Sequence, residues 1–121
     1  MTLIANSFIA LIAVLHVYIL VLEMFLWDKP AGLRAFGQSK AAAAATKVLA
    51  ANQGLYNGFL AAGLFWGLLL GDAGNDIKIF FLTCVLLAGL YGAATASRKI
   101  LFIQALPAAL GLILLFLSRA P

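Results

Sequence analysis

The chain has 121 residues, of which 65% are hydrophobic and 10% are charged, and its net charge is +4. A soluble domain carries roughly 45–50% apolar and about 25% charged residues, and one this small could not bury so much hydrocarbon. The composition therefore excludes an ordinary water-soluble domain and predicts a single transmembrane domain over residues 1–121.

The first predicted membrane span covers residues 3–27 and contains His16 and Glu23, seven positions apart. At about 100° per residue this spacing brings both side chains to one stripe of the helix, and Trp27 falls on the same stripe. Ionisable side chains in a membrane segment normally point into a bundle or a wet cavity. For Glu23 two interpretations stay open: a ligand-binding carboxylate, or a carboxylate that reaches the interface or pairs with Lys47 or Arg98.

Residues 28–46 form the one long connection. Pro30 should end the first helix, because the residue before a proline is pushed away from helical geometry. The stretch 30–36 is predicted to form one or two helical turns at the membrane interface. Ser39 is predicted to cap a second long helix that begins near Lys40.

The second predicted span, residues 47–70, carries four polar side chains near one end: Asn52, Gln53, Tyr56 and Asn57. Polar groups at membrane depth need hydrogen-bond partners, because hydrocarbon offers none. Two interpretations stay open here as well: these side chains bind a ligand, or they only hold helices together.

The last two predicted spans are residues 77–96 and 100–117, joined by a link short enough to force an antiparallel hairpin. Tyr91 and Gln104 are their polar candidates at comparable depth. Pro107 is predicted to kink the fourth span, because it leaves the carbonyl of Ile103 without its helical donor.

Basic residues are distributed unevenly about these spans. Six lie in the connection 28–47 and in the third-to-fourth link, against Lys78 and Arg119 on the opposite side. The positive-inside rule then places the loop 28–46 in the cytoplasm and both termini outside. The predicted fold is all-α: an antiparallel four-helix bundle that crosses the bacterial inner membrane four times.

The stretches HVYILVLEMFLW in the first span and TKVLAANQGLYNGFLAAGL in the second resemble the small membrane proteins catalogued as domain of unknown function thirteen-oh-four. The resemblance covers nearly the whole chain. It implies a four-span membrane protein, found mostly in bacteria, and it implies no activity.

The sequence predicts a polar pocket in the cytoplasmic half, which binds or transports a small polar or cationic molecule or a lipid headgroup. The predicted ligand-binding residues are His16, Glu23, Asn52, Gln53, Tyr56, Asn57, Tyr91 and Gln104. The alternatives are a proton-coupled small exporter and a non-catalytic accessory protein whose polar residues only fix helix packing.

No catalytic residue, metal site or cofactor is predicted. Cys84 and Ser7 are not placed to meet His16 as nucleophiles, and a single histidine, one glutamate and amides make a poor zinc or iron set. The absence of a basic helix face or nucleic-acid motif argues against nucleic-acid binding. The partners expected are membrane lipid, a small-molecule ligand and a second copy of the chain.

Overall fold

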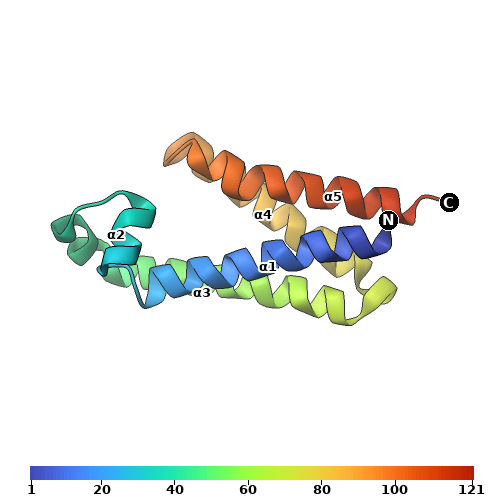
Figure 1. Ribbon diagram of the computed structural model, residues 1–121, viewed down its shortest axis with the longest axis horizontal. Coiled ribbons are helices and arrows are strands. Elements are labelled where there is room, and N and C mark those ends of the chain that lie inside the picture. Colours follow the sequence, from blue (N-terminus) through green and yellow to red (C-terminus); the bar gives the residue numbers. More distant parts are fainter. The chain divides into compact units, whose positions relative to one another are not determined.

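A computed structural model describes all 121 residues and contains helices but no strand. The elements in chain order are α1 (Thr2–Met24), α2 (Pro30–Phe36), α3 (Lys40–Leu69), the 3-10 helix η1 (Gly71–Gly74), α4 (Asn75–Thr95), the π-helix η2 (Leu101–Ala105) and α5 (Leu106–Arg119) (Figure 1). The predicted all-α class is confirmed.

Three helical segments are long and apolar enough to cross a membrane: Thr2–Met24, Gly71–Thr95 and Leu101–Arg119. The prediction of four such segments is wrong in its count, because α3 does not qualify. Length is not the reason, since its 30 residues extend about 45 Å at 1.5 Å per residue. The amides of Asn52, Gln53 and Asn57 lower its mean hydropathy instead.

Large apolar side chains face outward on the three qualifying segments. Leu3 is 80% exposed, Phe80 is 62% exposed and Phe102 is 65% exposed. Soluble monomers rarely expose contiguous apolar surface on this scale. Lipid hydrocarbon around these side chains would remove the free-energy cost of exposing them to water. The exposed apolar surface therefore agrees with the membrane protein that the composition predicts.

Contacts divide the chain into two compact units. The first, here called the hairpin unit, consists of Met1–Ala13 and Ala62–Pro121. The second, here called the loop unit, consists of Val14–Ala61 and contains the whole connection between α1 and α3.

Most local signals in the loop unit act as the sequence predicts, but Pro30 does not end the first helix, because α1 ends at Met24, six residues earlier. Pro30 lies in the first turn of α2, where its fixed φ suits a helix start, and the helix ends at Gly37 with φ 61°. The Ser39 Oγ accepts the backbone N–H of Ala42 at 3.1 Å and so caps α3. The predicted short helix at 30–36 and the predicted cap are confirmed.

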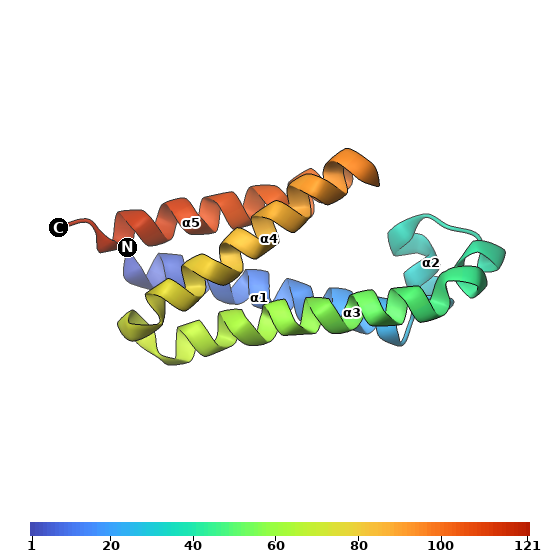
Figure 2. The same cartoon turned by 180° about the vertical axis from the view of Figure 1, so that it is seen from behind.

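In the hairpin unit, α4 and α5 run antiparallel, as Figure 2 shows. Gly89 allows their backbones to approach, because a Cβ there would lie 2.8 Å from the Cα of Ala105. Near Pro107 the helical ladder changes register, and the Leu106 N–H bonds the carbonyl of Leu101, five residues earlier. The disturbance predicted from the proline therefore takes the form of a π-helix just before it.

The other end of the hairpin unit is held by a buried lysine. Lys78 has no exposed surface, and its Nζ donates to Asn6 Oδ1 and to Asn75 Oδ1, both at 3.1 Å. The backbones of Gly67 and Gly74 touch beside it. The sequence analysis used Lys78 only as a charge on one side of the membrane, whereas the structure buries this side chain of α4 against Asn6 of α1.

Candidate functional site

The candidate site lies in the loop unit and starts from Glu23, one residue before the end of α1. Its side chain is only 7% exposed. The helix α3 approaches α1 closely here, because a Cβ on Gly54 would lie 2.7 Å from Met24 Cγ and 3.0 Å from Glu23 Cβ. Glycine at this position therefore brings the polar arc of α3 up to the carboxylate.

The carboxylate is held by an amide of α3. Asn57 Nδ2 donates to Glu23 Oε1 at 2.6 Å and also lies 3.3 Å from the backbone oxygen of Gln53. Asn57 is buried, at 9% exposed. An ionised carboxylate offers about four lone-pair sites, so this bond leaves acceptor capacity on Glu23.

Beside this bond is a cavity of about 360 Å³, lined by Glu23, Trp27, Gln38, Thr46, Leu49, Ala50 and Gln53. Gln38 comes from the connection after α2. Its Nε2 atom is buried and has no hydrogen-bond partner. Leaving such a donor unpaired costs about 1–3 kcal/mol.

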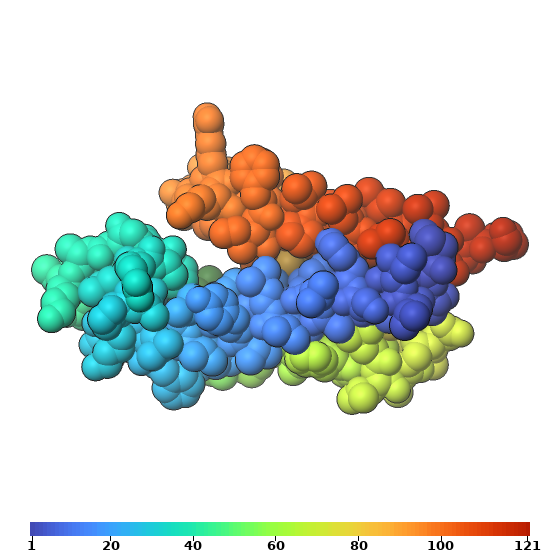
Figure 3. Space-filling view, in the orientation of Figure 1, coloured from blue at the N-terminus to red at the C-terminus, as the bar shows by residue number.

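Aromatic and hydroxyl contacts fix the wall of the cavity. The Trp27 indole N–H donates to Thr46 Oγ1 at 3.1 Å, and the Thr46 hydroxyl donates to the Ala42 carbonyl at 2.8 Å. The rings of Trp27 and Phe36 lie 4.7 Å apart between centroids. In the space-filling view the cyan surface of α2 continues without a break into the end of α1 (Figure 3).

Asp28 and Lys47 form an ion pair close to the end of α1. Lys47 Nζ lies 3.1 Å from Asp28 Oδ2, and this hydrogen bond holds the pKa of the Asp28 carboxyl below its usual value of 3.8. The suggested pairing of Lys47 with Glu23 is wrong, because Lys47 is paired with Asp28 and Glu23 with Asn57.

The structure places the other predicted residues as follows. Asn52 bonds the Val48 carbonyl of its own helix at 2.9 Å and is exposed, and Tyr56 is 59% exposed against Phe59. His16 is fully buried in the loop unit. The hairpin unit contains Tyr91, which is 74% exposed, and Gln104, which is half-buried.

Of the predicted residues, the structure brings together Glu23, Gln53 and Asn57; the ligand-binding role of the whole set stays a prediction. Sequence reasoning missed Gln38 and Thr46 as lining residues. Nothing in a single sequence marks them, because their places depend on how the connection folds back. Trp27 did carry a signal, since it shares the stripe of Glu23.

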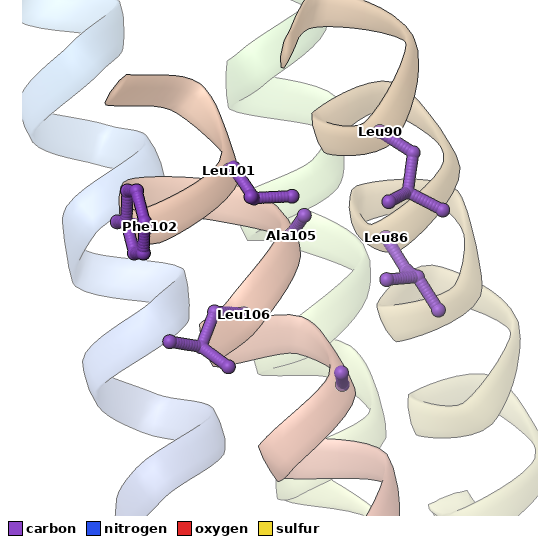
Figure 4. Close-up of a pocket in the computed structure, with 7 residues that line it drawn as sticks. Leu86, Leu90, Leu101, Phe102, Ala105 and Leu106 are labelled. Carbon is purple, nitrogen blue, oxygen red and sulfur yellow. The ribbon is translucent and has the colours of Figure 1, made fainter. Parts of the chain in front are cut away.

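A second cavity, of about 260 Å³, lies in the hairpin unit, where side chains of α4 face those of η2 and α5 (Figure 4). It is lined by Leu86, Leu90, Leu101, Phe102, Ala105, Leu106 and Ala109. These side chains are all hydrocarbon and offer no group that could orient a polar ligand. No group of three or more His, Cys, Asp or Glu side chains gathers anywhere in the chain to hold a metal.

Comparison with known proteins finds one family model and one curated relative. The model, described as "Protein of unknown function (DUF1304)", matches residues 10–116, which confirms the resemblance drawn from the sequence. Uncharacterized protein YpaA of Lactococcus lactis subsp. lactis (strain IL1403) is 31% identical over 115 residues, 93% of this chain and 97% of YpaA. No solved structure matches the chain.

Proposed function

Because the chain belongs to the family of proteins of unknown function DUF1304, whose description names no activity, we propose a function from its own residues. The protein binds a small polar or cationic molecule, or a lipid headgroup, in the cavity beside Glu23. We place the protein in the bacterial cell membrane, which is the inner membrane in bacteria that also have an outer one.

The observation that carries this proposal is the buried Glu23 carboxylate at the wall of a cavity of about 360 Å³. Small-ligand sites have volumes of roughly 300–1,000 Å³ and are apolar with a few polar groups that fix orientation. This cavity is open to the surface, its volume falls in that range, and Leu49 and Ala50 lie beside Glu23, Gln38 and Gln53 in its lining. A carboxylate at membrane depth is costly, and the single bond from Asn57 brings it no positive charge, so a cationic ligand would gain by meeting it.

The proposal includes a fourth membrane crossing by α3. The end of α1 lies by the Asp28–Lys47 pair, and Asn6, near the start of α1, bonds Lys78 of α4. These contacts support the proposal that α3, which runs from Lys40 to Leu69 just before η1, returns across the span that α1 makes. With six basic residues on one side against two on the other, this crossing puts both termini outside.

Cysteine labelling on intact cells tests this topology. In a Cys84→Ala background, a membrane-impermeant maleimide should label the Ser118→Cys variant and spare the Ser39→Cys variant until the cells are opened. Equal labelling of both variants on intact cells would show that α3 does not cross.

Ligand-induced shifts in Tm test the binding. The purified full chain is heated with potassium, guanidinium, spermidine, O-phosphoethanolamine and tetramethylammonium, and in bilayers of different headgroups. At least one of these should raise the Tm of the wild type and of the Asp76→Asn control, which removes an exposed carboxylate of the hairpin unit. The Glu23→Gln variant should lose this rise. If it keeps the rise, or if no probe raises the wild-type Tm, the proposed function fails.

A further inference from the structure

The cavity contains an unpaired donor as well as an acceptor, and together they define a ligand class. This inference rests on the proposed function. We propose that the site binds a molecule with a primary ammonium group and, a short distance along the same molecule, an oxygen that accepts a hydrogen bond, as in an ethanolamine phosphate. This group occurs both in a soluble metabolite and in a lipid headgroup.

The acceptor side of the cavity selects for a cation that can donate hydrogen bonds. Glu23 accepts one bond from Asn57 and retains lone pairs. The lining contains no lysine or arginine, so no side chain of the cavity neutralises this carboxylate. The nearby Lys47 is paired with Asp28.

The donor side selects for an oxygen next to that cation. Gln38 Nε2 is buried in a residue that lines the same cavity, and it has no partner. The indole N–H of Trp27 is already bonded to Thr46 and does not compete for the ligand. A ligand with only an ammonium group would leave the Gln38 donor unpaired, whereas a phosphate or ester oxygen would pair it.

The aromatic content separates a primary ammonium from a quaternary one. Quaternary ammonium groups are recognised by cages of several aromatic faces. Trp27 is the one aromatic residue of this lining, and its indole ring lies against Phe36. The cavity therefore offers hydrogen-bonding groups for N–H donors in place of a cage for methyl groups.

Binding is measured on the purified full chain by the emission of Trp27, in a Trp66→Phe background that leaves one tryptophan. Three soluble probes are compared: O-phosphoethanolamine, phosphocholine and n-propylamine, which lacks an acceptor oxygen. We expect phosphocholine and n-propylamine to bind about tenfold or more weakly than O-phosphoethanolamine. Equal affinity for phosphocholine would overturn the proposal.

Two variants assign the groups. Glu23→Gln should weaken the binding of O-phosphoethanolamine by about tenfold or more, whereas the control Asp76→Asn, an exposed carboxylate of the hairpin unit, should leave its affinity unchanged. Gln38→Leu should lower the affinity for O-phosphoethanolamine toward that for n-propylamine. The affinity for n-propylamine itself should stay unchanged. This second variant alters a residue outside the long helices, so it stays informative if Glu23→Gln fails to fold. If Gln38→Leu weakens both probes equally, the pairing with the acceptor oxygen is wrong.

Bilayers separate the two sources of the group. A lipid source predicts that Trp27 emission differs between bilayers of phosphatidylethanolamine and phosphatidylcholine, with the difference lost in Glu23→Gln. A soluble source predicts a response to O-phosphoethanolamine in either bilayer. If neither responds while another cation still raises Tm through Glu23, this inference falls and the proposed function stands.

Discussion

The buried lysine of the hairpin unit gives the sharpest test of the packing, through the bond from Lys78 to Asn6. Replacing a buried charge with an apolar side chain is often neutral or stabilising, because it also removes a desolvation cost. The stability of Lys78→Met alone is therefore ambiguous. A double-mutant cycle of Lys78→Met with Asn6→Ala isolates the interaction energy of the pair.

The magnitude follows from the geometry. The bond is 3.1 Å long, its donor is an ammonium, and it joins residues 72 positions apart. Hydrogen bonds between helices in membrane proteins average about 0.6 and reach about 1.7 kcal/mol. Because the donor is charged and fully buried, we expect a coupling in the upper part of this range, about 1–1.7 kcal/mol.

The assay is reversible unfolding in mixed micelles with increasing dodecyl sulfate, followed by helical circular dichroism. Lys99→Met serves as the control, because Lys99 is an exposed lysine of the same unit, and its cycle with Asn6→Ala should give a coupling near zero. A Lys78–Asn6 coupling no larger than that of the control would refute the account of Lys78 as a tie between α1 and α4.

Two further predictions concern backbone contact and pH. Gly74→Ala should destabilise the protein by about 1–3 kcal/mol in the same unfolding assay, because its Cβ would overlap the backbone of Gly67. Gly58→Ala should cost less, since the flexible end of the Leu20 side chain is what its Cβ would meet; an equal loss would contradict this reasoning. The pKa of Asp28 is lowered by Lys47, so the stability from this pair is present above the usual pKa of 3.8 and is lost as pH falls through the lower, folded value. The free energy of unfolding, measured from pH 6 downward, should therefore fall less below pH 3.8 in Asp28→Asn than in the wild type. Parallel curves for the two proteins would argue against a stabilising Asp28–Lys47 pair.

Close approach of helices was only partly readable from the sequence. Gly54 and Gly58 form a GxxxG pattern, which favours packing against a neighbour, and a Cβ at either would meet side chains of α1. The pattern could not name α1 as that neighbour. The contact of Gly54 with Glu23, which brings the carboxylate to Asn57, depends on the turn through α2.

Local patterns along the chain are enough to predict most of the helices and where their polar side chains lie. Apolar runs of membrane length, the cap at Ser39 and the proline at the start of α2 act within a few residues, so they can be read along the chain. The stripe of His16 and Glu23 follows from helical periodicity in the same way, and both side chains are buried.

The hydrogen-bond partners of these polar side chains depend on the folded chain. Gln38 reaches the cavity because the connection folds back over the end of α1, and Lys78 is buried because Asn6 meets it from far along the chain. Such contacts join residues through space, and no local pattern records them. Hydrogen-bond partners of buried polar groups are fixed by the fold as a whole, and they determine which of the polar residues form a site.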